Sequence, residues 1–157
     1  MIQLKTDEEI EIQRQSSLLV GKTLAEVAKH IKPGIKTSYL DKIAEEFILD
    51  HGAVPGFKGY GGFPGTLCIS VNDEVVHGIP GERELIDGDI VSIDCGTLMN
   101  GFYGDSAYTF AVGNVDAEIL ELLKRTKESL YLAIEQAVAG KRIGDIGFAV
   151  QKHVESF

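Results

Sequence analysis

The sequence predicts an α+β fold in which a mainly antiparallel sheet is covered by helices. Segments with amphipathic helical spacing occupy both ends of the chain, from about residue 7 to 51 and again after residue 115. The middle of the chain instead carries short apolar runs typical of strands. Two of these runs flank Asn100-Gly101, a pair that is among the strongest sequence signals for a hairpin.

Composition restricts the possible classes of protein. With 157 residues, 44% hydrophobic and 25% charged, the chain is typical of one globular domain. We expect neither a membrane span nor a signal peptide, and the net charge of −9 argues against nucleic acid or an anionic membrane as partner. The two cysteines, Cys68 and Cys95, form no C-x-x-C pair, so free thiols in the cytoplasm are expected.

Two helices are expected first. Thr6 and Glu9 form a capping box that opens a helix running to about His30. Its expected apolar face consists of Ile10, Leu18, Val20, Leu24, Val27 and Ala28. Ser38 and Asp41 are expected to start a second helix, which ends at about residue 51. Its apolar positions are Leu40, Ile43, Ala44, Phe47 and Ile48.

A glycine- and proline-rich loop follows over residues 53–66. It contains the aromatic residues Phe57, Tyr60 and Phe63. These side chains are either anchors packed on the core or the wall of an apolar pocket. Two short strands, Leu67–Val71 and Glu74–Ile79, are expected next, about a turn at Asn72-Asp73.

The predicted hairpin, with strands Ile90–Thr97 and Phe102–Val112, carries an acidic pair. Alternation places Asp94 on the face opposite Val91, Ile93 and Cys95. Asp105 in the returning strand is either directly opposite or diagonal to Asp94, depending on where the turn is centred. The two carboxylates either face water or share a divalent cation that cancels their repulsion.

Helical spacing returns after Gly113. Asp116 is expected to cap a helix that ends at Gly140, and Asp145 is expected to cap another. The first has Ile119, Leu120, Leu123, Leu130, Ala133, Ile134 and Ala137 as apolar positions, and the second has Ala149, Val150 and Val154. The segment from Lys32 can be laid on the segment from Val138, with Gly34 on Gly140, which indicates an internal repeat. Residues 7–112 would then form one helix-helix-sheet unit and residues 113–157 the helices of a second, incomplete unit.

Several motifs together resemble the N-terminal part of a type I methionine aminopeptidase. They are CISVNDEVVHGIP (68–80), LIDGDIVSIDCG (85–96) and NGFYGDSAYTFAVG (100–113), with agreement also in KGYGGFPGTLCIS and the KPGI segment. The resemblance implies a pita-bread fold: a curved, pseudo-twofold sheet with helix pairs behind it. Residues 1–157 would form a single incomplete domain of this kind, comprising its first half and the helices of its second half.

The resemblance also implies a function and a site. The family removes N-terminal methionine from peptides and nascent proteins with two divalent metal ions, Mn²⁺, Fe²⁺ or Co²⁺. Asp94 and Asp105 match its two aspartate ligands. His77 matches the histidine that contacts the substrate near the scissile bond, although an ordinary strand-end histidine is the other interpretation. Tyr60, Phe63 and Cys68 match positions that line the pocket for the methionine side chain.

The matched part lacks the family's other ligands, a histidine and two glutamates, which lie in a further hundred or so residues. His30, His51 and His153 are interpreted as structural. The alternatives to a methionine aminopeptidase are a non-catalytic binding or assembly module on the same fold and a prolidase-like relative. Apolar helix faces and a sheet edge without their partner also predict a homodimer that completes the pseudo-twofold.

Overall fold

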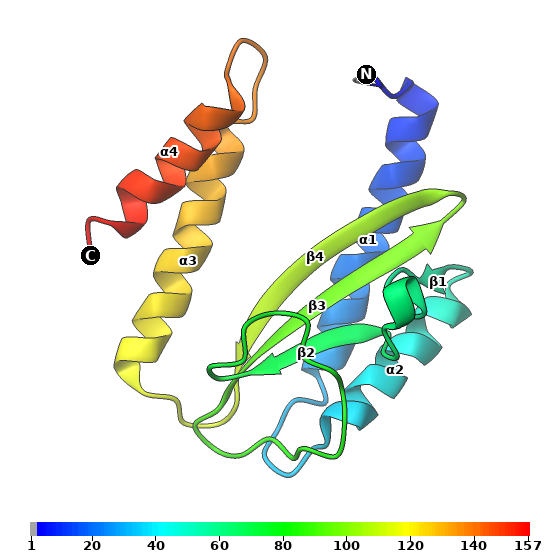
Figure 1. Cartoon of the computed structure of the whole chain (residues 1–157), viewed down its shortest axis with the longest axis vertical. Coiled ribbons are helices and arrows are strands. Elements are labelled where there is room, and N and C mark those ends of the chain that lie inside the picture. The colour runs from blue at the N-terminus through cyan, green and yellow to red at the C-terminus, as the bar shows by residue number, and fades with distance from the viewer. Residues whose placement is uncertain (1–2) are drawn as a thin grey trace. The chain divides into compact units, whose positions relative to one another are not determined.

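The computed structural model describes residues 3–157 and has the expected α+β composition (Figure 1). The elements, in order, are α1 (Asp7–Ala28), α2 (Thr37–Asp50), β1 (Val54–Pro55), the 3₁₀ turn η1 (Tyr60–Gly62), β2 (Leu67–Val71), β3 (Ile90–Met99), β4 (Phe102–Ala111), α3 (Ala117–Gln136) and α4 (Ile143–Val154). The chain divides into two compact units, one ending at Asn114 and one beginning at Val115. No helix within the described range is long and apolar enough to cross a membrane.

β3 is the central strand of an entirely antiparallel sheet. It pairs with β4 from Ile90 to Met99 along one edge. β2 pairs with residues 91–95 of β3, and the short β1 pairs with residues 97–98, so these two strands share the other edge in succession. The predicted hairpin is therefore the part of the sheet from which every other strand is positioned.

The hairpin turn has only two residues, Asn100 and Gly101, with φ values of 50° and 83°. Positive φ at both central residues is the conformation that suits the right-handed twist of the flanking strands, and Asn and Gly tolerate it best. The turn places Asp94 opposite Ala107 and Asp105 opposite Gly96. Of the two registers left open by the sequence, the diagonal one is therefore confirmed.

The core of the first unit lies between the sheet and α1 and α2, which Figure 1 shows behind the strands. The capping box between Thr6 and Glu9 is present at the start of α1. Val20, Leu24 and Val27 are buried as predicted, but Ile10 and Leu18 are half exposed, and Leu19 is buried instead. The buried face of α1 differs from the predicted one because Ser16 lies against the backbone of β4. A Cβ on Gly104 would lie 2.6 Å from the Ser16 carbonyl carbon.

The start of α2 differs from the prediction. Its N-cap is Lys36, not Ser38, and the Asp41 carboxylate does not cap the helix. One Asp41 oxygen instead accepts hydrogen bonds from the backbone N–H groups of Thr66 and Leu67, at 2.8 and 2.7 Å. Asp41 thus ties α2 to the first residue of β2.

The predicted strand Glu74–Ile79 was wrong. These residues form no strand, because Val76 and His77 have φ values of 34° and 53°, which extended backbone does not allow. The segment still touches the sheet, since the Ile69 N–H donates to the Gly78 carbonyl at 2.9 Å. It therefore lies against the middle of β2 as an irregular loop.

The second unit is the helix pair α3 and α4. Asp116 caps α3 as predicted, through a hydrogen bond from the Glu118 N–H. The helix ends at Gln136, four residues before Gly140. α4 begins at Ile143, so Asp145 lies in its first turn, where its carboxylate accepts the Arg142 N–H at 2.8 Å.

Candidate functional site

The two aspartates of the hairpin lie on the sheet face that α1 and α2 do not cover. Along β3, Val91, Ile93 and Cys95 are fully buried on the helix side, while Asp94 between them is only partly buried. On β4, Gly104 faces α1, so its neighbour Asp105 points to the opposite face. Since the two residues are diagonal across one strand pair, their carboxylates reach each other.

The proximity of the two carboxylates affects the pKa of Asp94. Burial, the negative charge of Asp105 and a hydrogen bond shared with it raise the pKa of Asp94 from 3.8 to about 6. The charge of His77 and the Cys95 N–H oppose this pKa increase. At neutral pH two repelling carboxylates therefore lie side by side, an arrangement that favours a bound cation.

A cavity of about 280 Å³ opens over this part of the sheet. Residues from β2, β3, β4 and the irregular loop line it: Cys68, Ser70, Glu74, Val75, Val76, His77, Ser92, Asp94 and Ala107. The cavity thus brings together Cys68 and His77 from one sequence motif and Asp94 from another. Asp105 does not line this cavity, but its negative charge raises the pKa of Asp94, which does.

Cys68 remains a thiol in this setting. Burial, with the negative charges of Asp94, Asp105 and Asp41, raises its pKa to about 11. A protonated thiol is a poor metal ligand and a soft, nearly apolar surface. The chemistry of Cys68 therefore fits the wall of a pocket better than a ligand set.

The loop aromatics are placed differently from one another. Tyr60 lies in η1 and is 84% exposed, and neither Tyr60 nor Phe63 lines the cavity. Phe57 lies against β3, where any Cβ on Gly96 would overlap its ring. Gly96 pairs with Asp105, so Phe57 covers the sheet beside the acidic pair. From the sequence alone, Phe57 was one of three loop aromatics with no distinguishing feature. The glycine at position 96, which leaves room for the Phe57 ring on β3, was the one signal that could have indicated its position.

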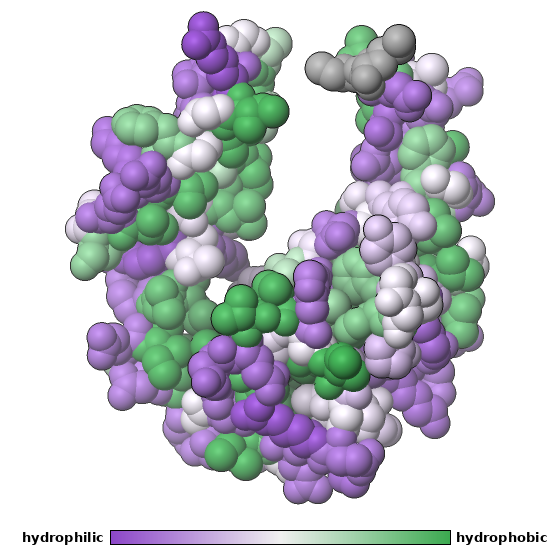
Figure 2. All heavy atoms as spheres, viewed as in Figure 1, coloured by the Kyte–Doolittle hydropathy of each residue, from purple (hydrophilic) through white to green (hydrophobic). Residues whose placement is uncertain are grey.

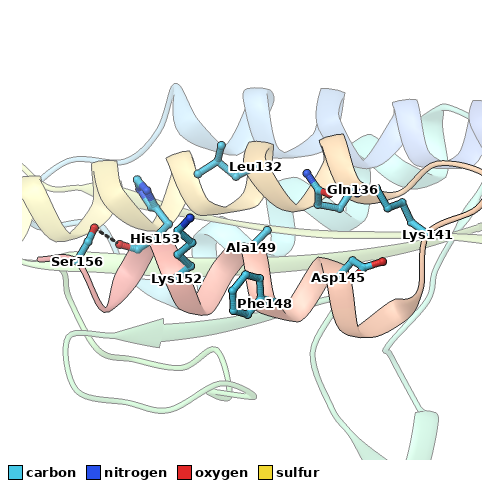
Figure 3. Close-up of a pocket in the computed structure, with 9 residues that line it drawn as sticks. All are labelled: Leu132, Gln136, Lys141, Asp145, Phe148, Ala149, Lys152, His153 and Ser156. Carbon is cyan, nitrogen blue, oxygen red and sulfur yellow. Dashed lines mark hydrogen bonds between the residues drawn. The ribbon is translucent and has the colours of Figure 1, made fainter.

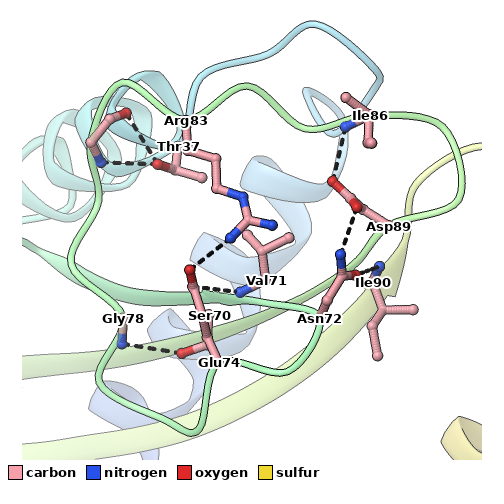
Figure 4. A network of polar contacts seen from close by, with 11 residues as sticks. Thr37, Ser70, Val71, Asn72, Glu74, Gly78, Arg83, Ile86, Asp89 and Ile90 are labelled. Carbon is pink, nitrogen blue, oxygen red and sulfur yellow. Dashed lines mark hydrogen bonds and ion pairs between the residues drawn. The ribbon is translucent and has the colours of Figure 1, made fainter.

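The irregular loop that carries His77 is held by a polar network (Figure 4). The Asn72 side chain donates to Asp89 at 2.8 Å and accepts from the Ile90 N–H at 3.0 Å. Glu74 accepts from the Val71 N–H through one oxygen and pairs with Arg83 through the other, at 2.9 and 2.7 Å. Because Arg83 neutralises Glu74, the uncompensated negative charge at the cavity comes from the two aspartates.

A larger cavity, about 630 Å³, lies in the second unit along α3 and α4 (Figure 3). Its lining residues are Leu132, Gln136, Lys141, Asp145, Phe148, Ala149, Lys152, His153 and Ser156. None of the predicted site residues lies there. His153, interpreted as structural, sits 3.3 Å from Glu128 and packs on the Phe157 ring with centroids 5.2 Å apart.

The residues at the acidic pair fit a divalent metal in kind but not in number. Carboxylate oxygens suit hard divalent ions such as Mn²⁺, and their mutual repulsion is relieved by a cation. Yet within residues 3–157 no three or more His, Cys, Asp or Glu side chains cluster so as to hold a metal ion. Asp94 and Asp105 thus form one side of a metal site.

Comparisons with known proteins agree with this chemistry. Residues 11–157 match the model of metallopeptidase family M24. The chain is 51% identical to a methionine aminopeptidase of Clostridium acetobutylicum, covering 100% of this chain, and 52% identical to methionine aminopeptidase 1 of Bacillus subtilis, covering 99%. It spans 63% of the length of each of these relatives.

Solved structures of other proteins also superpose closely on this chain. A methionine aminopeptidase from Rickettsia prowazekii matches with a TM-score of 0.97 at 35% identity, over 99% of this chain and 63% of the other. A prolidase from Pyrococcus furiosus matches with a TM-score of 0.87 at 23% identity, over 98% and 44%, and shows the shared fold alone. The predicted pita-bread fold and the resemblance are both confirmed: the chain belongs to metallopeptidase family M24.

Proposed function

We propose that this chain provides the two-aspartate side of an aminopeptidase site that removes N-terminal methionine from peptides and nascent proteins. The observation that carries the proposal is the convergence of Asp94, His77 and Cys68 on one cavity, with Asp105 beside Asp94. The relatives that bear the name methionine aminopeptidase support the choice of reaction.

Each residue has a defined part in the proposal. Asp94 and Asp105 would provide carboxylate ligands to two divalent ions, for which we propose Mn²⁺, Fe²⁺ or Co²⁺. Such ions, when bound, supply Lewis acidity toward the peptide carbonyl and a nucleophile at neutral pH. His77 donates a hydrogen bond to the carbonyl oxygen as negative charge develops on it. Cys68 provides apolar contact for the methionine side chain from inside the cavity, and Tyr60, Phe63 and Phe57 provide it from the loop outside the cavity lining.

Metal binding and hydrolysis test this proposal separately. Calorimetry with Mn²⁺ is expected to show binding to the chain that is lost in Asp94→Asn and in Asp105→Asn. A methionyl peptide is then supplied with the metal, and release of free methionine is followed by chromatography. Equal metal affinity in the wild type and both variants contradicts the ligand assignment.

A non-catalytic binding module is the second candidate. It is favoured by the small number of ligands, two carboxylates, that the described residues bring to the site. A module of this kind binds Mn²⁺ and retains methionyl peptide without releasing methionine. The same calorimetry, repeated with peptide in the cell, distinguishes the two: peptide affinity without product favours the module.

We also propose that the two helix pairs are repeats and that copies of the chain associate. Gly34 and Gly140 share a left-handed φ, 85° and 88°, and α2 and α4 begin at Thr37 and Ile143, the spacing that places Gly34 on Gly140.

The proposed association rests on apolar side chains that lie exposed along α3 and α4 (Figure 2), among them Leu130, Ile134 and Phe148. Light scattering is expected to show a homodimer, and a monomer at micromolar concentration contradicts the association.

A further inference from the structure

His77 is held in a backbone conformation that its sequence does not favour. Its φ is 53°, and that of the preceding Val76 is 34°. For residues other than glycine this region is strained, and β-branched valine tolerates it least. Two such residues in succession persist only if their surroundings hold them in place.

The residue after His77 is fixed to β2 by two hydrogen bonds. The Gly78 carbonyl accepts from the Ile69 N–H at 2.9 Å. The Gly78 N–H donates to the Ser70 hydroxyl oxygen at 3.1 Å, as Figure 4 shows. A Cβ on Gly78 would overlap the Ile69 carbonyl oxygen, so the backbone lies directly on the strand. The Gly78 N–H belongs to the planar peptide group that begins with the His77 carbonyl. The Ser70 contact therefore sets the orientation of the peptide that leaves His77.

The other contacts of the loop lie further from His77. Glu74 ties the loop to Val71 and Arg83 before His77. After it, the Gly81 N–H donates to the Thr37 hydroxyl at 2.9 Å. Ser70 is the side chain bonded to the residue adjoining His77, is 4% exposed, and lines the same cavity as His77 and Asp94.

We propose that Ser70 is a positioning residue for His77: its hydroxyl oxygen, by accepting the Gly78 N–H, keeps the left-handed backbone that directs the imidazole to the acidic pair. The catalytic consequence rests on the role of His77 in the proposed function, whereas the structural claim does not. Ser70 touches neither substrate nor metal in this proposal and transfers no proton.

The test uses ¹⁵N-labelled chain and four proteins: wild type, Ser70→Ala, Ser70→Thr and Ser16→Ala. Ser70→Ala removes the acceptor, and Ser70→Thr restores it. Ser16→Ala is the matched control, because Ser16 is also a buried serine of the first unit but bonds to Thr97, away from the loop. A positive φ gives a strong NOE between a residue's own amide and Hα protons, so this signal at His77 reports the backbone directly.

Ser70→Ala is expected to weaken the His77 NOE and to speed exchange of the Gly78 amide about tenfold. Ser70→Thr and Ser16→Ala are expected to keep both at the wild-type value. An unchanged His77 NOE in Ser70→Ala overturns the proposal, as does an equal loss in Ser16→Ala or a failure of Ser70→Thr to restore it.

Peptide hydrolysis gives the second arm. Where the wild-type chain releases methionine, Ser70→Ala is expected to lower kcat about 10- to 100-fold with KM within about twofold, because a displaced group costs mainly in the chemical step. Reduced kcat without any change at His77 overturns the positioning role. A wild-type chain that releases no methionine contradicts the proposed function, and the NMR arm still decides the structural claim.

Discussion

The two units contain similar helix pairs with very different surroundings. α1 buries six residues against the sheet, Ser16, Leu19, Val20, Thr23, Leu24 and Val27. α3, of similar length, buries only Ser129 and Ala133, and α4 buries none. All four helices are amphipathic in sequence. The comparison teaches that helical spacing identifies which residues share a face, while a sheet decides whether that face is covered.

The largest expected effect comes from the contact that covers α1. In Gly104→Ala the new Cβ meets the Ser16 and Ser17 backbone at 2.6–2.7 Å, so helix and strand must separate. We expect the first unit to lose about 3 kcal/mol of stability, measured by thermal unfolding and by exchange of the β3 amides. Unaltered exchange of the β3 amides would mean that α1 moves away from β4 without loss of stability, and that α1 is packed on the sheet less tightly than its burial indicates.

The next effect is a dependence on pH at the acidic pair. The pKa of Asp94 is about 6 in the folded chain against an ordinary 3.8. Because the pKa of Asp94 is raised in the folded chain, its contribution to stability is fully present below about pH 3.8. That contribution is lost as the pH rises through about 6. Asp94→Asn removes this loss, so the variant is expected to be more stable at pH 7 by about 1–2 kcal/mol, allowing for partial exposure, and equal at pH 3.5.

Denaturant titrations across this pH range measure the difference between the two proteins. Millimolar Mn²⁺ at pH 7 provides the control, since a bound cation is expected to stabilise the wild type and not Asp94→Asn. If the stability difference between wild type and Asp94→Asn is the same from pH 3.5 to 7, then Asp105 does not raise the pKa of Asp94.

A smaller pair of effects compares the helix N-termini. Thr6→Ala and Asp116→Ala each remove a side-chain cap, from α1 and α3 respectively. Each is expected to cost about 1 kcal/mol. The loss at α1 should appear in global unfolding of the first unit, and the loss at α3 as local fraying seen by helix amide exchange. The reverse pattern would contradict the difference in burial between the units.

The smallest effect has the opposite sign to that of Gly104→Ala. A Cβ at Gly147, in the exposed part of α4, meets no heavy atom within 4 Å. Gly147→Ala is expected to stabilise α4 by about 0.5–1 kcal/mol through helix propensity alone. Helix content from circular dichroism measures it, and a destabilised variant would reveal a neighbour that covers this glycine.

The sequence predicted elements better than contacts. Helix and hairpin periods located most of the secondary structure. The Asn100-Gly101 pair located the hairpin turn, but the choice between the two registers came from the strand pairing in the structure. Leu18 and Leu19 are adjacent and equally apolar, so period alone did not show which is buried. That choice depends on where Ser16 meets Gly104, a contact between distant parts of the chain.

The candidate site divides in the same way. The acidic pair Asp94 and Asp105 came from the hairpin pattern, whereas His77 and Cys68 came from the motif resemblance, which carries no geometry of its own. The strand expected at Glu74–Ile79 failed because the left-handed backbone at His77 is imposed by Ser70 and Ile69 across the loop, and local propensity does not encode it. Tyr60 lies on an exposed 3₁₀ turn, and the spacing of aromatic residues in the sequence did not predict this position either.

The two-residue turn also has a kinetic consequence. Asp94 and Asp105 are eleven positions apart and come together within a single hairpin, a contact that closes a short loop and forms within about 1–10 μs in isolated hairpins. We expect His77 to join them later, because its loop is bonded to β2, which must first pair with β3. The repulsion between the carboxylates is therefore present before the rest of the site exists. We therefore expect low pH or a divalent ion, which relieve this repulsion, to raise the folding rate of the chain more than they lower its unfolding rate.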